Sequence, residues 1–251
     1  MADLPEGTVT FLFTDVDRST ELVKRLQERY GTVLAKHRAL LRAAFVEHGG
    51  AEIDTQGDAF FVAFTRARDA VAAAIAAQRA LAEHPWPDEA PVSVRMGLHT
   101  GEAYPAEHGY VGVAVHRAAR ICTTAHGGQI LLSQSTAGIV DDEDIPGVAL
   151  RDLGEHRLKD IDRPERISQL VIDGLPCDFP PLRTIDQQIP LAGTVTIVLA
   201  EGRRMMRLSR ELTPDHLREP YRGRRARGKE KHAEGSGESS RRTPVCRSGA
   251  G

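Results

Sequence analysis

GTVTFLFTDVDRST at positions 7–20 and EIDTQGDAFFVAF at positions 52–64 decide the fold of this 251-residue chain. In the first stretch, apolar side chains alternate from Val9 to Phe13, which predicts a strand with one strongly apolar face and one mixed face. The second stretch predicts a β-hairpin, because two strand-like arms flank the turn sequence Gln56-Gly57-Asp58.

Each stretch carries an aspartate where a strand ends, Asp15 in the first and Asp58 in the second. Two strand-end carboxylates that converge on one point suit a hard cation such as Mg2+, which binds one or two carboxylates together with substrate phosphates. Both aspartates also have an ordinary structural interpretation, Asp15 as part of a helix-capping sequence and Asp58 as a turn residue. Their spacing alone leaves both interpretations open.

The composition indicates one large domain, or one domain and a tail. Hydrophobic residues make up 41% of the chain, which is enough for a core, and no apolar run approaches the ~20 residues of a membrane span. The N-terminal sequence is acidic and lacks an apolar signal core, so we expect a cytoplasmic protein. The net charge of -2 conceals an asymmetry, because the chain from Gly202 onward holds 14 basic and 6 acidic residues.

Periodicity predicts an α+β order in which antiparallel strands carry helices on one face. Beyond the first strand and the hairpin, helices are expected over 21–29, 32–48, 66–83, 113–124 and 133–140, and strands over 92–103, 129–133, 148–159 and 166–172. A loop is expected from Tyr104 to Gly109. The domain limits predicted from this order are 1–174 for the folded unit, 175–192 for a Pro-rich linker and 193–251 for a tail.

Five sequence motifs in this order resemble the class III adenylate/guanylate cyclase catalytic domain. They are FLFTDVDRST (11–20), TQGDAFFVAF (55–64), VRMGLHTGEA (94–103), VGVAVHRAARICTTAHGGQILLS (111–133) and HRLKDIDRPERISQL (156–170). The resemblance covers Gly7 to Val171 and is closer to an actinobacterial branch whose domain often precedes an ATPase and a DNA-binding module. It implies a ferredoxin-like fold, a head-to-tail homodimer and active sites at the interface.

The resemblance also implies a site that uses two Mg2+ or Mn2+ ions. Asp15 and Asp58 match the two metal-binding aspartates, and a metal ion would lower the pKa of the ribose 3'-hydroxyl that attacks the α-phosphorus. Arg95 and Lys159 match residues that contact the terminal phosphates, for which lysine supplies a point charge. The alternatives are an outward-facing strand residue for Arg95 and a solvated loop residue for Lys159.

His116 and Arg120 are four residues apart and therefore share one helix face. The family has asparagine and arginine there, supplied across the dimer interface. Arg120 matches the arginine and would stabilise charge on the α-phosphate, or else form an interface salt bridge. His116 departs from asparagine, so its role in positioning the ribose competes with a packing role at the interface.

The positions that read the base depart further from the family pattern. Where adenylate cyclases have a lysine and an aspartate, this chain has Asp54 and Gly109. A carboxylate only accepts hydrogen bonds, so Asp54 can take the amino group of adenine or the N1–H and N2–H of guanine. Gly109 has no side chain that could contact the base, and its alternative interpretation is a simple loop glycine. We therefore expect weak base selection and low turnover.

Three functions follow from these residues. The first is a cyclase that converts ATP, or alternatively GTP, to a 3',5'-cyclic nucleotide and pyrophosphate. The second is a cyclase-like module that binds nucleotide or dimerises with little or no turnover. The third, a transcriptional regulator, ranks last because the chain shows no helix-turn-helix pattern.

The tail contains a partial repeat of the first strand. GTVTIVLAEG at 193–202 parallels the sequence at 7–16, with Glu201 in the place of Asp15, which indicates either a remnant second unit or a coincidental strand. The sequence beyond it is polar and arginine-rich, so we expect disorder. A basic tail can bind nucleic acid nonspecifically, but aromatic residues beyond Tyr221 are lacking, and specific binding is not expected.

Overall fold

The computed structural model describes residues 4–87, 90–106, 109–143 and 145–184, so the predicted repeat strand and basic tail lie outside the described residues. Strands form at β1 (Gly7–Val16), β2 (Ala51–Gln56), β3 (Ala59–Phe64), β4 (Val94–Ala106), β5 (Gly109–Val111), β6 (Ile130–Ser133), β7 (Val148–His156) and β8 (Glu165–Ile172). Helices form at α1 (Ser19–Leu26), η1 (Gln27–Arg29), α2 (Tyr30–Glu47), α3 (Ala67–Glu83), α4 (Val113–Thr124) and α5 (Gln134–Val140).

The strands form a mixed sheet in the order β2-β3-β1-β4-β6-β8-β7, with β5 paired to β4 alone. Its first half runs β1, α1 and α2, β2, β3, α3, β4 along the chain and β4-β1-β3-β2 in space, which is the ferredoxin-like arrangement. The predicted α+β, ferredoxin-like class is therefore confirmed. The expectation of purely antiparallel pairing is wrong at one place, because β4 and β6 run parallel.

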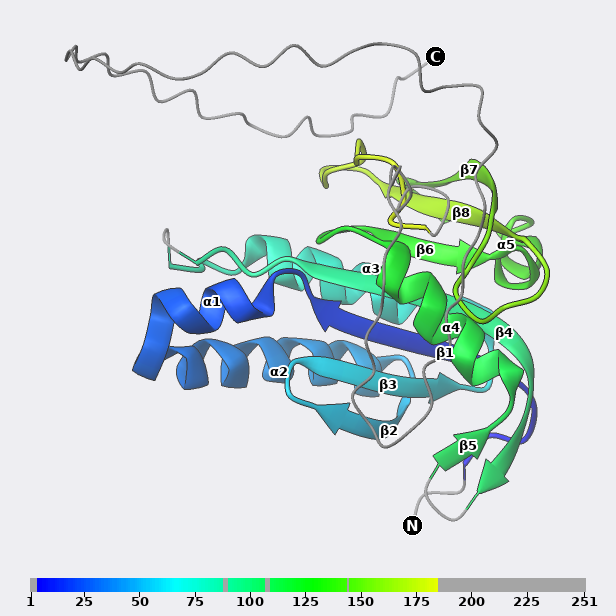
Figure 1. Ribbon diagram of the computed structural model, residues 1–251, viewed down its shortest axis with the longest axis horizontal. Coiled ribbons are helices and arrows are strands. Elements are labelled where there is room, and N and C mark those ends of the chain that lie inside the picture. Colours follow the sequence, from blue (N-terminus) through cyan, green and yellow to red (C-terminus); the bar gives the residue numbers. More distant parts are fainter. Residues whose placement is uncertain (1–3, 88–89, 107–108, 144, 185–251) are drawn as a thin grey trace, which may run out of the picture. The chain divides into compact units, whose positions relative to one another are not determined.

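Helices cover both faces of the sheet, whereas the sequence pattern predicted one covered face. Leu12 of β1 is buried with the residues of α2 and α3, and Phe11, which points the other way, is buried against α4. Figure 1 shows α4 in front of the sheet and α2 and α3 behind it. The mixed face of β1 is buried as well, since Thr10 and Thr14 are each 1% exposed.

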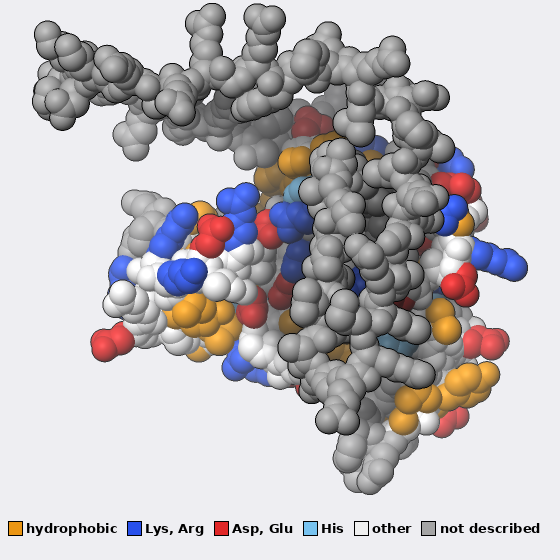
Figure 2. All heavy atoms as spheres, in the orientation of Figure 1, with side chains coloured by type: hydrophobic (Ala, Val, Ile, Leu, Met, Phe, Trp, Pro, Cys, Tyr) orange, Lys and Arg blue, Asp and Glu red, His pale blue; other side chains and the backbone are white. Residues whose placement is uncertain are grey.

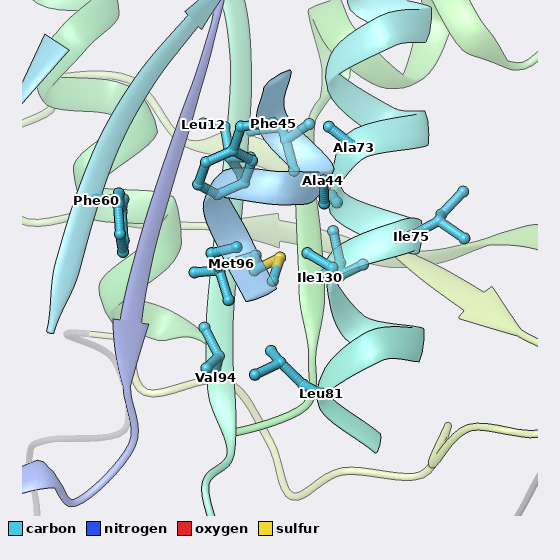
Figure 3. Packing of buried hydrophobic residues seen from close by; sticks show 14 of the residues in the cluster. Leu12, Ala44, Phe45, Phe60, Ala73, Ile75, Leu81, Val94, Met96 and Ile130 are labelled. Carbon is cyan, nitrogen blue, oxygen red and sulfur yellow. The ribbon is translucent and has the colours of Figure 1, made fainter. Parts of the chain in front are cut away.

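The larger core lies between the sheet and the helices α2 and α3 (Figure 3). Phe45 of α2 packs edge-on against Phe60 of β3, with ring centroids 5.6 Å apart. Ala73 of α3 is fully buried in the same cluster. Its small side chain lets that helix approach its neighbours closely. Burial of a phenylalanine such as Phe45 stabilises the fold by roughly 1.5–3 kcal/mol.

Helix α1 follows β1 and covers one end of this core. Its buried side chains are Leu22 and Leu26, four positions apart on one face, while charged residues occupy the outward face. Figure 2 shows acidic and basic side chains interspersed there.

Two predicted boundaries differ from the structure. The expected loop from Tyr104 to Gly109 lies largely in strands, because β4 continues to Ala106 and pairs with the short β5. The start of the predicted linker, residues 175–184, lies against the folded unit rather than apart from it, since the Leu182 side chain is only 3% exposed in an apolar cluster. The rest of that stretch, 185–192, lies outside the described residues.

Candidate active site

Asp15 and Asp58 lie at the ends of adjacent antiparallel strands. The pairing of β1 with β3 ends with Thr14 opposite Phe60, so the next residue along β1 is Asp15 and the turn before β3 holds Asp58. The predicted hairpin is confirmed, with β2 and β3 joined at Gly57-Asp58. Strand register therefore brings together two carboxylates that are far apart in the sequence.

The electrostatic surroundings of Tyr30, the first residue of α2, show the same convergence. Burial raises the pKa of Tyr30, and the negative charges of Asp58 and Asp15 raise it further. Oδ2 of Asp58 is buried and has no hydrogen-bond partner among the described residues. An orphaned buried carboxylate oxygen is a costly feature in a fold unless a cation or ligand satisfies it.

This donor set fits a hard divalent ion. Carboxylate oxygens suit Mg2+ and Mn2+, and Mg2+ takes one or two protein carboxylates and completes its octahedron with water and phosphate oxygens. Among the described residues no group of three or more histidine, cysteine, aspartate or glutamate side chains could hold a metal by itself. In a site made of Asp15 and Asp58, water and the phosphate oxygens of a nucleotide would therefore complete the coordination.

Arg95 is directly opposite Asp15 in the pairing of β1 with β4. Its Nε donates to Oδ2 of Asp15 at 3.0 Å, and Nη2 donates to the same oxygen. Burial is the largest single effect and lowers the pKa of Arg95, but the hydrogen bond to Asp15 and the negative charges around the guanidinium together outweigh it, so the net pKa is raised. A cation that binds Asp15 must share the carboxylate with Arg95 or displace the guanidinium, which is then free to meet a phosphate.

Arg38 of α2 supports the turn that carries Asp58, and the sequence analysis missed it. Its Nε donates to the backbone oxygen of Gly57 at 3.0 Å, and Nη2 donates to the same oxygen. Arg42, one helical turn further on, pairs with Glu52 of β2, Nη2 to Oε1 at 2.7 Å. The signal was present as two arginines at i and i+4 on a helix that precedes an acidic hairpin.

Helix α4 has the bounds that its sequence predicted and carries His116 and Arg120. Its buried face is made of small and apolar side chains, Ala114, Ala118, Ile121 and Cys122 among them, and His116 is exposed. Arg120 donates from Nη2 to Oδ2 of Asp160 at 2.5 Å, next to the exposed Lys159. No hydrogen bond or ion pair within the described part of the chain joins Arg120 to Asp15 or Asp58.

Gly109 approaches the side chain of Ile53, the residue before Asp54 in β2. A side-chain carbon at Gly109 would come within 2.7 Å of Cγ2 of Ile53, and the φ of Gly109 is +105°, a conformation that favours glycine. The exposed carboxylate of Asp54 accepts from the backbone N of Thr55 at 2.8 Å and from Nε2 of Gln56 at 2.7 Å. Asp54 therefore keeps lone pairs for a ligand, whereas Gly109 contributes only its close approach to β2.

Comparison with known proteins identifies the family to which this fold belongs. Residues 2–166 match the protein family described as "Adenylate and Guanylate cyclase catalytic domain". The chain belongs to this family. The resemblance found in the five motifs is thereby confirmed, and the chain carries a nucleotide cyclase catalytic domain.

The relatives of this cyclase domain include curated proteins and a solved structure. An uncharacterized protein of Mycobacterium tuberculosis is 40% identical over 182 residues, which are 72% of this chain and 61% of that protein. An adenylate cyclase of Podospora anserina is 31% identical over 221 residues, covering 66% of this chain and 10% of that protein. A structure of adenylate cyclases from Trypanosoma brucei in their monomeric state is 26% identical with a TM-score of 0.64, covering 71% of this chain and 95% of that one.

The cyclase chain thus spans about 61% of the length of the mycobacterial relative that it matches. No helix in the described part of the chain has both the length and the apolar character needed to cross a membrane.

Proposed function

We propose that this protein is a homodimeric nucleotide cyclase that converts ATP to 3',5'-cyclic AMP and pyrophosphate with the help of Mg2+ or Mn2+. The observation that carries this proposal is Oδ2 of Asp58, which is buried beside Asp15 and has no hydrogen-bond partner among the described residues. In a cyclase fold, two such carboxylates are suited to bind a divalent cation together with the phosphates of a nucleoside triphosphate.

The reaction replaces one P–O bond by another. The ribose 3'-hydroxyl loses its proton to solvent, its oxygen forms a bond to the α-phosphorus, and the bond from the α-phosphorus to the oxygen that bridges to the β-phosphate breaks to release pyrophosphate. Two metal ions, when bound, lower the pKa of the attacking hydroxyl and neutralise the phosphates. Asp15 and Asp58 would hold them. Arg95, once released from Asp15, and the exposed Lys159 supply positive charge for the terminal phosphates.

Arg120 would act from the second subunit, where it stabilises the charge that develops on the α-phosphate. His116, one turn earlier on α4, would position the ribose with a single hydrogen bond. Within the described part of one chain, Arg120 makes no hydrogen bond or ion pair with either aspartate, which supports a shared site. So do three exposed apolar side chains near the start of α4, Tyr104 at 67%, Val111 at 56% and Val113 at 64%, which a partner subunit would cover.

The site distinguishes adenine from guanine less directly than it indicates a metal and a triphosphate. Asp54 accepts hydrogen bonds only, so it can hold the amino group of adenine or the two N–H groups of guanine, and Gly109 has no side chain to add. GTP is therefore the second candidate substrate. The departures at Asp54, Gly109 and His116 also favour low turnover, with a nucleotide-binding or dimerisation role as the alternative.

Incubation of the purified full chain with Mn2+ and either ATP or GTP, followed by chromatography of the products, tests this proposal. We expect cyclic AMP and pyrophosphate in equal amounts, with less product from GTP. Cyclic GMP as the main product would assign the second substrate. Absence of both cyclic products from a dimeric, folded sample would reject the enzyme in favour of the binding module.

A further inference from the structure

Residues 175–184, which we name the C-terminal strap, return to the folded unit after the last strand. Leu182 is buried in an apolar cluster with Ile121 of α4 and Leu131 of β6. The backbone N of Arg183 donates to the carbonyl of Thr124, the last residue of α4, at 3.0 Å. Nε2 of His126 lies 3.1 Å from the carbonyl oxygen of Pro181. These contacts attach the strap to the C-terminal end of α4.

The side chain of Arg183 reaches a second element, the turn between β1 and α1. Its two terminal nitrogens donate to the two carboxylate oxygens of Asp17, Nη1 to Oδ1 at 2.8 Å and Nη2 to Oδ2 at 3.0 Å. The Asp17 side chain is only 16% exposed and that of Arg183 34% exposed. A bidentate pair with this little exposure fixes the relative position of its two partners more firmly than a solvated ion pair does.

The β1–α1 turn needs such support. Arg18 has a φ of +57°, in the left-handed region that disfavours residues with a side chain, and no side chain caps the start of α1. Asp17 holds the turn in place instead: its backbone N donates to the carbonyl of Ser93 at 2.8 Å, and its carboxylate accepts from Arg183 and, at 3.4 Å, from the backbone N of Gly127. The proposed metal ligand Asp15 is two residues before this anchored position.

We infer that Arg183 is a positioning residue that holds the β1–α1 turn, and with it Asp15, at a set distance from the end of α4, which carries Arg120. The inference rests on the proposed function for its catalytic meaning, because it assigns Asp15 and Arg120 to the reaction. In a dimer with shared sites, Asp15 and Arg120 of one chain serve different sites. The strap therefore links the two active sites of the dimer through each chain.

Arg183→Ala in the full-length chain tests this inference, and Arg151→Ala is its matched control. Arg151 also binds the strap, at the carbonyl of Cys177 and the carboxylate of Asp178, but it does not reach the β1–α1 turn. Arg183→Lys keeps the charge and loses the bidentate geometry. We expect hydrogen exchange in the peptide over 15–22 to accelerate in Arg183→Ala, less in Arg183→Lys and not in Arg151→Ala.

The kinetic readout is the Mn2+ concentration that gives half-maximal turnover. We expect a rise of about tenfold in Arg183→Ala, the low end of the cost of removing a contact behind a metal ligand. We expect an intermediate Mn2+ concentration for Arg183→Lys and an unchanged one for Arg151→Ala. A general loss of stability would not produce this pattern.

Each result bears on one hypothesis. Unchanged exchange over 15–22 in Arg183→Ala overturns the positioning role, whether or not the wild type turns over nucleotide. Equal acceleration in Arg151→Ala overturns it too, because any loosening of the strap would then suffice. A turn that loosens only in the Arg183 variants, in a chain that makes no cyclic product, supports the anchoring by Arg183 and rejects the cyclase function.

Discussion

One carboxylate oxygen of Asp58 is buried without a hydrogen-bond partner among the described residues, and Asp15 is held by Arg95. The two aspartates thus differ in their effect on the stability of the fold. Asp15 has a cationic partner that offsets the cost of its partial burial. Asp58 has a buried oxygen whose lost hydration no hydrogen bond from the described residues replaces. Such a group is retained where function requires it, at the expense of stability.

Asp58→Asn should separate these two effects. We expect turnover to fall by at least about 100-fold, because an amide is a poor substitute for a carboxylate ligand. The free energy of unfolding should stay the same or rise by about 1 kcal/mol, because the variant removes a partly buried charge. Product chromatography and urea unfolding measure the two quantities. The exposed Asp142→Asn is the control, and wild-type turnover in Asp58→Asn across a Mn2+ titration would disprove the metal assignment.

His37 gives the fold a pH dependence. It is 1% exposed on α2, neither ring nitrogen has a hydrogen-bond partner among the described residues, and burial followed by the charge of Arg38 lowers its pKa to about 4. The unfolded chain binds a proton at this site below a pH of about 6.5, and the folded chain does so only near its own lower pKa. The contribution of neutral His37 to the free energy of unfolding is therefore fully present above a pH of about 6.5 and declines as the pH falls from there to about 4.

We expect acidification from pH 7 to pH 4 to lower the free energy of unfolding by roughly 3 kcal/mol through His37 alone, because its pKa is about 6.5 in the unfolded chain and about 4 in the folded protein. His99 should add to the decline, because burial and Arg117 lower its pKa to about 4 as well. His37→Leu should flatten the profile of unfolding free energy against pH. Parallel profiles for variant and wild type between pH 4 and 6.5 would show that His37 is protonated in the folded protein.

Helix α4 crosses β4 at close range. A side-chain carbon at Gly97 of β4 would lie 2.3 Å from the backbone N of Cys122, so α4 rests directly on the strand. Cys122 also donates from its thiol to the carbonyl of Arg95, at 3.6 Å. This close crossing sets the position of α4, and therefore of Arg120, relative to the strand that carries Arg95.

Gly97→Ala should force α4 away from the sheet. The clash is with backbone, which cannot rotate aside, so we expect a loss of up to about 3 kcal/mol of unfolding free energy. Turnover per folded molecule should fall as well, since Arg120 moves with the helix. Gly138→Ala on α5, where an added methyl group meets nothing within 4 Å, is the matched control. Equal melting temperatures for the two variants would contradict this packing.

At the scale of the whole molecule, the proposed site is incomplete in a single chain. Asp15, Asp58 and Arg95 converge at one place, whereas Arg120 pairs with Asp160 and makes no hydrogen bond or ion pair with either aspartate within the described part of the chain. A two-fold dimer with shared sites would supply each set of carboxylates with the arginine of the other chain.

Mixing inactive variants tests this arrangement. Asp58→Ala combined with Arg120→Ala should recover about a quarter of wild-type activity, because half of a random mixture is heterodimer and one of its two sites carries neither change. Asp58→Ala combined with Asp15→Ala is the control and should stay inactive, since each site of that heterodimer carries one change. Failure of the first mixture to recover, with subunit exchange verified by mass spectrometry, would place each site within one chain.

Much of the architecture was determined by the sequence itself. The bounds of α4, the hairpin turn at Gly57-Asp58 and the strand that ends near Asp15 follow from periodicity and turn chemistry, which act over a few residues. The ordered motifs likewise led to the family, because each motif is a local pattern. These features depend on neighbours in the chain and can be derived without knowledge of the fold.

Tertiary structure alone decided what depends on partners distant in the sequence. One such feature is the placement of α4 on the face opposite α2 and α3. The pairing of Arg95 with Asp15 and the return of Arg183 to Asp17 join residues 80 and 166 positions apart. Short β5 escaped prediction because three residues carry too little periodicity. Strand register, helix packing and long-range ion pairs are properties of the assembled sheet and its layers, so no local pattern encodes them.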